Sequence, residues 1–397
     1  MMKKAVTAAV AASIALGCSS DPSVPANAMI RDSAGVRIVL NADSPLPSWR
    51  LSEDAVLSIG SVNGEGGQDL ALPWSSVRVA DGRIAVANAR TDELRFYDST
   101  GSFIRAVGGK GEGPGEFGLI ALLNTFRGDS IIAADAMNPR LTLFDSEGAF
   151  GRTVSLGDLE GRLPRFQGLL TEDIGLYRVT FFQRGGGRSR AVRDTFLLAL
   201  KSFDGPWNHI GRFAANEKFN QWLPNGSVAA WNLPFARSVQ TAVGNGVAWV
   251  GVSDKYEVKA YGTDGTLKQI VRVDRAPRPV TDDLRARFFA HQIDSADDDD
   301  QRRRFRSVHD IIEFPPTLPA FSALQLDSEG RLWVREYELP WETGPAVWRV
   351  FDTEGIARAV VDLPSALTIQ EIGHDYLRGL WRDELGVEFI RAYAIIR

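Results

Sequence analysis

The hexapeptide Phe96-Tyr97-Asp98-Ser99-Thr100-Gly101 decides the fold, because variants of it recur along the chain with alternating apolar residues on both sides. The later variants are Phe144-Asp145-Ser146-Glu147-Gly148, Phe203-Asp204-Gly205, Tyr261-Gly262-Thr263-Asp264-Gly265 and Phe351-Asp352-Thr353-Glu354-Gly355. This pattern predicts a tight turn between two antiparallel strands at each copy. Asp98 and Asp145 are 47 residues apart, and repeats of that size built from short strands are typical of a β-propeller.

The aspartates and glycines of these turns have a structural explanation. Asp opens a type I turn and accepts a hydrogen bond from the backbone N–H two residues later, and Gly takes the left-handed position that follows. We therefore interpret the following residues as turn residues and not as catalytic groups: Asp98, Gly101, Asp145, Gly148, Gly265, Asp352 and Gly355.

Four-stranded meanders, the units of propeller blades, divide the chain into six parts. Complete meanders are predicted in residues 76–107, 120–155, 166–213, 238–273 and 320–362. Residues 368–396 give only three strands, and residues 55–67 are predicted to supply the missing outer one because they resemble residues 103–115. The sequence thus predicts an all-β, six-bladed propeller closed by N- and C-terminal strands in its last blade. Residues 35–40 are a candidate for a further strand of that blade.

The N-terminus indicates export. Met1-Met2-Lys3-Lys4 precedes an apolar run at residues 5–17, and Cys18, the single cysteine, follows. A basic start, a short apolar run and a small residue before the cleavage site predict a signal peptide over residues 1–17. The ending Ala15-Leu16-Gly17-Cys18 resembles a bacterial lipobox, in which the cysteine is lipidated, although lipoboxes usually have Leu in the place of Ala15. An ordinary signal peptide with a chance cysteine is the alternative.

The predicted domain division follows from these segments. A flexible tether, rich in Ser, Pro, Ala and Asn, spans residues 18–29, and the propeller spans residues 30–397 with an insertion at residues 280–319. A lipidated Cys18 would carry several acyl chains, which suffice for stable anchoring. We expect a protein of the bacterial cell envelope, on the periplasmic or the cell-surface side, that touches the membrane only through this anchor.

Neither composition nor motifs identify an enzyme. The formal net charge of −5 gives no general basic surface, so a nucleic-acid partner is not expected. The four histidines lack metal-ligand spacing, and no Gly-x-Ser-x-Gly motif occurs. The glycine run at residues 109–115 lacks the ending of a phosphate loop. We interpret this run as a crossover between blades, formed by Gly111, Gly113, Pro114 and Gly115. No catalytic residue and no cofactor is predicted, and a monomer is expected with the oligomeric state left open.

A metal-dependent hydrolase is the alternative function. Six-bladed propellers can hold a divalent ion such as Ca²⁺ in the central channel and hydrolyse lactones or phosphoesters, with Glu, Asn and Asp as ligands. Near the predicted inner strands the chain offers Asn124, Asp173, Asn232 and Glu371, which form no motif.

Two insertions suggest where function lies. The first, residues 184–190, joins two strands of the third blade and is rich in Arg and Gly. It is either a solvated hairpin tip or a loop that contacts an anion or a glycan. The second has apolar residues at helical spacing in residues 283–290. An acidic block and then a basic block follow in residues 297–306, which suits a helix dipole and i,i+4 ion pairs.

Both insertions should lie on the same face of the propeller, around the channel mouth. Loops carried by a rigid scaffold commonly hold function, so we predict that this face binds a protein, a peptide or a glycan. Phe235 is a further aromatic residue nearby. The predicted binding residues are Arg184, Arg188, Arg190, Trp222, Trp231, Arg302, Arg303 and Arg304.

Three stretches resemble a known family. Residues 108–117, Gly-Gly-Lys-Gly-Glu-Gly-Pro-Gly-Glu-Phe, are similar to the crossover segment of NHL-type six-bladed propellers. Residues 30–39 and 375–388 resemble segments of bacterial six-bladed propeller lipoproteins. The resemblance covers nearly the whole chain after residue 30, and it implies a propeller fold and an envelope location without a settled biochemical role.

Overall fold

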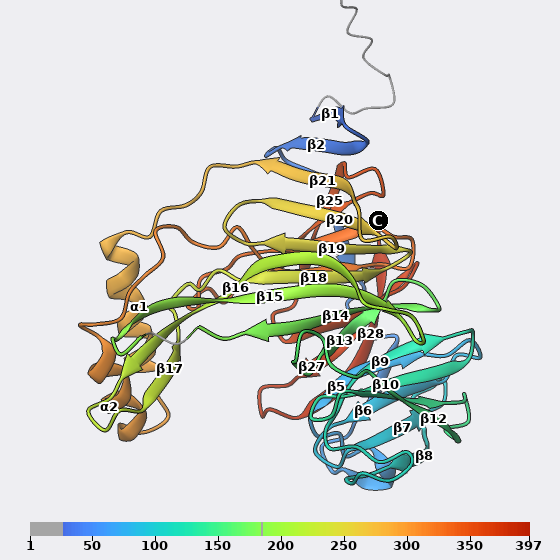
Figure 1. Cartoon of the computed structure of the whole chain (residues 1–397). Helices are drawn as coiled ribbons and strands as arrows, with labels where there is room; N and C mark the ends of the chain where they lie inside the picture. The colour runs from blue at the N-terminus through green and yellow to red at the C-terminus, as the bar shows by residue number, and fades with distance from the viewer. Residues whose placement is uncertain (1–26, 184–185) are drawn as a thin grey trace, which may run out of the picture.

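The computed structural model describes residues 27–183 and 186–397 (Figure 1). The predicted signal peptide, Cys18, most of the tether and Arg184 lie outside the described residues. The first strand, β1, begins at Ala28, so the last two residues of the predicted tether, 28 and 29, belong to the sheet.

Six antiparallel blades form the molecule, each with its first strand innermost. Blade one holds β5 (Pro73–Arg78), β6 (Ile84–Asn88), β7 (Glu93–Tyr97) and β8 (Phe103–Gly108). Blade two holds β9 (Ile120–Phe126), β10 (Ser130–Asp135), β11 (Arg140–Phe144) and β12 (Phe150–Ser155). Blade three holds β13 (Arg165–Leu169), β14 (Ile174–Phe181), β15 (Arg190–Ser202), β16 (Asn208–Trp222) and β17 (Val228–Asn232).

The second half of the ring repeats the pattern. Blade four holds β18 (Val239–Gly244), β19 (Val247–Val252), β20 (Glu257–Gly262) and β21 (Leu267–Asp274). Blade five holds β22 (Phe321–Leu326), β23 (Leu332–Glu336), β24 (Ala346–Phe351) and β25 (Ala357–Leu363). Blade six holds β26 (Leu367–Ile372), β27 (Tyr376–Arg382), β28 (Glu388–Ile396) and, from the N-terminal side, β4 (Leu57–Ile59).

The ring closes as the sequence predicts. β4 pairs antiparallel with β28, where Ile59 lies opposite Ile390, and both side chains are fully buried. A strand from each end of the chain therefore completes blade six and removes an open sheet edge. The short 3-10 turn η1 (Glu65–Gly67) follows β4 and leads toward blade one.

Residues 35–40 do not extend blade six, so that prediction was wrong. They lie in β2 (Val36–Ala42), which pairs antiparallel with β1 (Ala28–Ser33) and parallel with β21 of blade four. The reason is a better burial site: Val39 is fully buried, and Asn41 bonds to backbone groups of blades four and five. β3 (Ser48–Leu51) then runs between β25 and β28, and so joins blades five and six into one nine-stranded sheet.

The repeated Asp–Gly segments form turns at the ends of strands. Asp98 Oδ1 accepts hydrogen bonds from the backbone N–H groups of Thr100 and Ser102, both at 2.9 Å. Gly101 has a φ of 90°, which an L-residue with a side chain rarely adopts. The bond from the backbone N–H four residues later recurs at Asp145 and Asp352, and also at Asp327 and Asp383, two turns that the sequence pattern had not revealed.

Hydrophobic clusters fill the spaces between neighbouring blades. One cluster, for example, joins blades one and two through Phe96, Phe117 and Phe144, all of which are almost fully buried. Strand alternation places one set of apolar side chains on each face of a blade, so each blade is sandwiched between two others.

The predicted insertion between blades four and five is helical. It contains α1 (Asp282–Asp294) and α2 (Asp299–Val308). Figure 1 shows both helices beside β17 and the extended ends of β15 and β16, at one edge of the molecule. Within the described ranges, no helix is long and apolar enough to cross a membrane.

Candidate binding face

Three segments that are remote in the sequence form one projecting structure, which we call the platform. It comprises α1 and α2, the β14–β15 connection (the described residues 182–183 and 186–189) and the β16–β17 hairpin with the adjoining end of β15. The backbone N–H of Ala191 donates to Glu313 Oε1 at 2.9 Å, and that of Trp222 donates to Ser189 Oγ at 2.9 Å. The first bond joins β15, just after the insertion at residues 184–190, to the insertion at residues 280–319, and the second joins Ser189 of the former insertion to β16.

An aromatic cluster fixes the platform to the propeller. Phe235 is only 4% exposed, and its ring lies 5.4 Å from Phe288, 5.9 Å from Phe314 and 6.1 Å from Trp341. Rings at such distances and tilts pack favourably beyond the burial of their area. Phe235, which the sequence placed near the binding face, is therefore part of the core beneath the platform and does not join the exposed surface.

The sequence of each helix explains its ends. The Thr281 side chain accepts from the Leu284 N–H at the start of α1, and the Asp298 side chain accepts from the Gln301 N–H at the start of α2. Asp299 and Asp300 follow in the first turn of α2, where negative charge suits the helix dipole. The ion pairs on α2 have i,i+3 spacing and not the predicted i,i+4, because Arg302 reaches back to Asp299 at 2.8 Å.

Strand register gives the β15–β16–β17 ladder two different faces. Phe219 lies opposite Trp231, and Trp231 packs against Phe305 of α2 at 6.4 Å, so this face is turned toward the helices. Lys218 and Trp222 project from the opposite face, because side chains alternate along a strand.

Of the predicted binding residues, some are exposed on the platform and others are engaged within it. Arg188 and Arg190 are exposed at the start of β15, and Trp222 is 40% exposed. Arg304 is exposed on α2 and has no ion pair within the described ranges. Phe182, which the sequence reading missed, is 67% exposed and lies 5.1 Å from the Lys218 ammonium.

The other predicted binding residues that the structure describes are engaged by neighbours within the platform. Trp231 donates from Nε1 to Gln221 at 3.0 Å. Arg302 and Arg303 are each paired with an aspartate one turn earlier on α2. Their guanidinium groups are thus partly satisfied within the helix.

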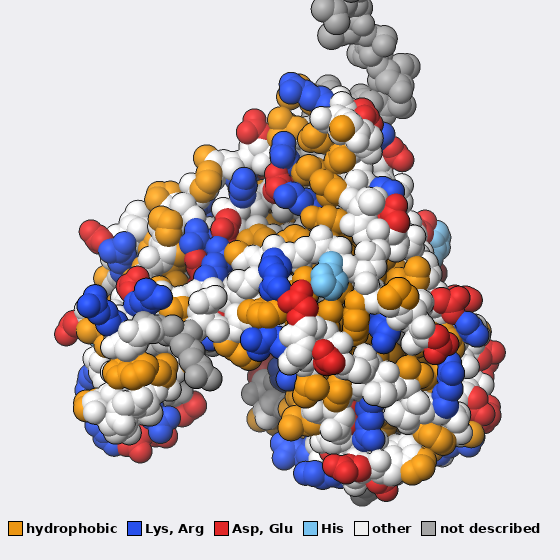
Figure 2. Space-filling view, in the orientation of Figure 1, with side chains coloured by type: hydrophobic (Ala, Val, Ile, Leu, Met, Phe, Trp, Pro, Cys, Tyr) orange, Lys and Arg blue, Asp and Glu red, His pale blue; other side chains and the backbone are white. Residues whose placement is uncertain are grey.

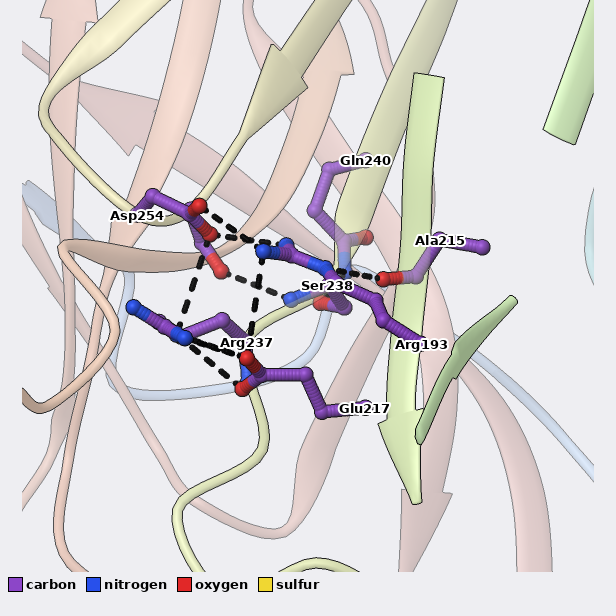
Figure 3. Close-up of polar contacts among 8 residues, drawn as sticks. Arg193, Ala215, Glu217, Arg237, Ser238, Gln240 and Asp254 are labelled. Atoms are coloured by element: carbon purple, nitrogen blue, oxygen red, sulfur yellow. Dashed lines mark hydrogen bonds and ion pairs between the residues drawn. The ribbon is translucent and has the colours of Figure 1, made fainter. Parts of the chain in front are cut away.

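A four-membered charge network lies where the platform meets blades three and four (Figure 3). Arg193 of β15 donates to both carboxylate oxygens of Asp254, at 2.8 and 2.7 Å, and to the Ala215 carbonyl at 2.9 Å. Arg237 donates through Nε to both oxygens of Glu217 at 3.0 Å. Such bidentate pairs fix geometry as well as charge.

The pKa shifts in this network follow from these contacts. Burial tends to raise the pKa of Asp254, but the hydrogen bonds and charge of Arg193 outweigh it, so the pKa is lowered. The hydrogen bond to Glu217 raises the pKa of Arg237. Both shifts favour the charged forms of Asp254 and Arg237 at neutral pH.

A second charge network lies between blades four and five. Arg275 donates to both oxygens of Asp43, at 2.8 and 2.9 Å, and pairs with Glu336 at 2.5 Å. Arg349 bonds to Asp43 at 3.0 Å and to Glu336 at 3.2 Å. Tyr256 completes it by donating its hydroxyl to Glu336 at 3.2 Å. No sequence motif signals either network, because the partners come from separate blades.

The central channel is a polar cavity of about 570 Å³ lined by the innermost strands of all six blades. Its lining includes the uncharged polar side chains of Asn124, Gln167, Thr241, Gln325 and Gln370, and the ionisable side chains of Arg78, Asp327 and Glu371. Hydrogen-bond donors and acceptors of both kinds therefore line the channel.

The residues considered for a metal do not converge. Asn232 lies on β17 in the platform, and Asp173 pairs with Arg127 at 2.5 Å in the turn after β13. Glu371 faces the channel but accepts from Arg378 and Tyr376. Burial, with nearby Glu371, raises the pKa of Tyr376 to about 12. In the part of the chain that the structure describes, no group of three or more His, Cys, Asp or Glu side chains is placed to hold a metal ion.

Comparisons with known proteins support the architecture. Residues 70–163 match the DUF5128 family, described as "6-bladed beta-propeller". No curated protein matches. Among solved structures, a member of the DUF4221 family from Bacteroides vulgatus is similar, with 10% identity and a TM-score of 0.53 over 88% of this chain and 99% of that one. Virginiamycin B lyase from Staphylococcus aureus is also similar, with 8% identity and a TM-score of 0.41 over 88% and 99% of the two chains.

The DUF5128 match and the DUF4221 structure agree with the propeller fold described above. The predicted resemblance to six-bladed propellers of uncharacterised function is confirmed, and the chain is a six-bladed β-propeller.

Proposed function

We propose that this protein is a lipid-anchored, extracytoplasmic propeller that binds a protein, peptide or glycan through its platform. The observation that carries the proposal is the construction of the platform: two helices and a long hairpin are packed onto one face through a buried aromatic cluster. A propeller does not need such a structure to close its ring, and binding commonly resides in segments carried by a rigid scaffold.

The outer surface of the platform has the composition of a binding site. Phe182 and Trp222 are exposed there beside Arg188 and Arg190, and exposed aromatic and Arg side chains are the groups that most often anchor interfaces. Figure 2 shows basic, acidic and hydrophobic side chains intermingled at this end of the molecule, with no large region of one charge. A mixed surface favours specific contacts over general attraction to a polyanion.

The proposed location rests on the N-terminal sequence. A basic start, an apolar run and the Ala15-Leu16-Gly17-Cys18 ending support export followed by lipidation of Cys18. In a bacterial host that expresses the chain, Cys18→Ser should move the protein from the membrane fraction to the soluble fraction. The unmodified protein should incorporate a labelled fatty acid, and the variant should not. Equal fractionation of the two proteins would refute the anchor.

Peptide and glycan arrays probed with the purified protein test the binding function. Trp222→Ala should weaken binding of any true ligand about tenfold or more, because a central aromatic anchor is commonly worth about 2 kcal/mol. Phe150→Ala is a matched control, since Phe150 has a similar exposed fraction, 42% against 40%, but lies on β12 of blade two. If every ligand binds both variants as well as it binds the unmodified protein, the platform is not the binding site.

A further inference from the structure

A separate pocket of about 420 Å³ lies between blades four and five, at the base of the helical insertion. The segments that line it are residues 254–256 after β19, residues 275–278 after β21, residues 318–320 before β22 and residues 336–338 at the end of β23. A pocket of this size accommodates a small ligand or one end of a chain.

Apolar side chains form most of the walls. Tyr256, Pro277, Leu318, Pro319 and Val347 line the pocket, and Tyr256 and Leu318 are almost fully buried. Proline and aromatic rings are stiff, so these walls lose little conformational entropy when a ligand packs on them.

The floor is the charge network of blades four and five. Arg349 is only 6% exposed and uses Nε for Glu336 and Nη2 for Asp43. Its remaining nitrogen, Nη1, is buried and has no acceptor within the described residues. A buried guanidinium nitrogen without an acceptor is uncommon, and water or a ligand oxygen usually completes it.

The pocket carries a surplus of positive charge. Its three carboxylates are each engaged: Asp254 by Arg193, Glu336 by Arg275, and Glu338 by Arg335 at 3.0 Å. Lys255 and Arg278 also line the pocket, are exposed, and have no carboxylate partner in residues 27–183 and 186–397. Arg278 is held in place by its hydrogen bond to the Tyr337 carbonyl at 2.9 Å.

We propose that this pocket binds a carboxylate carried on an apolar body, such as the C-terminal residue of a peptide or a free organic acid. Lys255 and Arg278 supply the charge that attracts the carboxylate, and the apolar walls receive the body to which it is attached. Charge-assisted hydrogen bonds to a carboxylate are among the stronger polar contacts in proteins. The site is distinct from the platform surface and needs no macromolecular ligand to be tested.

Isothermal titration with N-acetyl-L-phenylalanine and with its carboxamide tests the proposal, because the two probes differ only in the charged group. The acid should bind with a dissociation constant of about 1 mM, as expected for a ligand of this size. The carboxamide should bind about tenfold more weakly or not measurably. The affinity of the acid should fall as salt is added, since the cations are exposed.

Matched variants locate the site. Lys255→Gln and Arg278→Gln should each weaken binding of the acid about five- to tenfold and leave the carboxamide unchanged. Lys268→Gln makes the same charge change at an exposed position on β21 that does not line the pocket, and it should bind like the unmodified protein. Trp222→Ala should also bind the acid normally, so failure of this inference is distinguishable from failure of the proposed platform function.

Three results would overturn the proposal: no heat of binding for the acid at about 10 mM, roughly tenfold above the expected dissociation constant; equal affinity for acid and carboxamide; or unchanged affinity in Lys255→Gln. Lys255 is exposed, so its replacement should not disturb folding. Titration with glucuronate, which carries its carboxylate on a polar ring, tests the need for an apolar body. Tighter binding of glucuronate than of the acid would refute the requirement for an apolar body.

Discussion

Arg193 of β15 and Asp254, which follows β19, share two hydrogen bonds of 2.8 and 2.7 Å and so tie blade three to blade four. The pair stands at the root of the platform, where Arg193 also bonds to the Ala215 carbonyl (Figure 3). A long strand that leaves its blade needs such a fixed point, because the hydrophobic packing between blades does not extend along the projecting part.

The first prediction concerns this pair. Arg193→Gln should lower the free energy of unfolding by about 1–3 kcal/mol at pH 7, because it leaves Asp254 without its main partner. The pKa of Asp254 is lowered in the folded state, so its contribution is complete above its ordinary value of 3.8 and is lost as the pH falls through the folded value. In urea titrations, the difference in free energy of unfolding between the variant and the unmodified protein should thus be constant from about pH 5 to 8 and shrink below about pH 4. A difference that does not depend on pH down to about pH 2 would contradict the role of this carboxylate.

The second prediction concerns ring closure. Arg378 of blade six is 1% exposed, bonds to Ser76 of blade one at 3.0 Å, and pairs with Glu371. Arg378→Met should destabilise the protein by about 3–5 kcal/mol, since it leaves the Glu371 carboxylate without its cationic partner and removes one hydrogen bond from the Ser76 hydroxyl at the joint between first and last blades. Arg382→Met is the control, because that side chain is 53% exposed and its ion pair should be worth less than about 1 kcal/mol. Urea unfolding monitored by tryptophan fluorescence measures both, and equal midpoints for the two variants would refute the prediction.

The third prediction concerns the N-terminal strand β2. Asn41 is fully buried, donates to the carbonyls of Arg272 and Gly355 at 3.2 and 3.0 Å, and accepts from the Ala357 N–H at 2.8 Å. Asn41→Ala should cost about 2–4 kcal/mol, because three backbone groups lose their partner. Arg37→Ala, on the same strand but at an exposed ion pair, should cost less than about 1 kcal/mol. Thermal unfolding compares the stabilities of the two variants. If Asn41→Ala destabilised the protein no more than Arg37→Ala does, β2 would not be integral to the fold.

The fourth prediction concerns the platform core. Phe235→Ala should lower the stability of the platform by about 3–5 kcal/mol through lost packing, since the ring is buried among three other aromatic side chains. The loss should be local, because the cluster joins the platform to the ring and not the blades to one another. Hydrogen exchange should rise in residues 281–318 and 219–232 and stay unchanged in blades one and two. Faster exchange throughout the chain would show instead that the platform and the propeller unfold together.

Local patterns explain why most of the fold could be predicted. Alternating apolar residues mark strands, and the Asp–Gly turns at Asp98, Asp145 and Asp352 mark the hairpins between them. The outer strand of blade six could be found because residues 55–67 resemble the end of blade one. β2 was misplaced because alternation identifies a strand without naming its neighbour, and a parallel partner needs no hairpin to reveal it.

The site was less predictable for the same reason. The charged and aromatic residues of the insertions could be recognised as unusual, but nothing in the sequence separated exposed Trp222 from Trp231, which packs on α2, or from buried Phe235. Phe182 was missed because it is a single aromatic residue at the end of a strand, where burial is the ordinary expectation.

By itself the sequence determined the blade number, the turns and the presence of a helical insertion, since each depends on residues close together in the chain. It also indicated how the ring closes, because residues 55–67 resemble residues 103–115 at the end of blade one. Only the tertiary structure decided which charges meet, because Arg349 and Asp43 are 306 positions apart and Arg193 and Asp254 are 61 apart. The packing of neighbouring blades, and of the N-terminal segment against them, brings such residues together, and no local pattern encodes that proximity. The pocket between blades four and five is therefore a property of how these two blades pack, formed by segments that the sequence keeps apart.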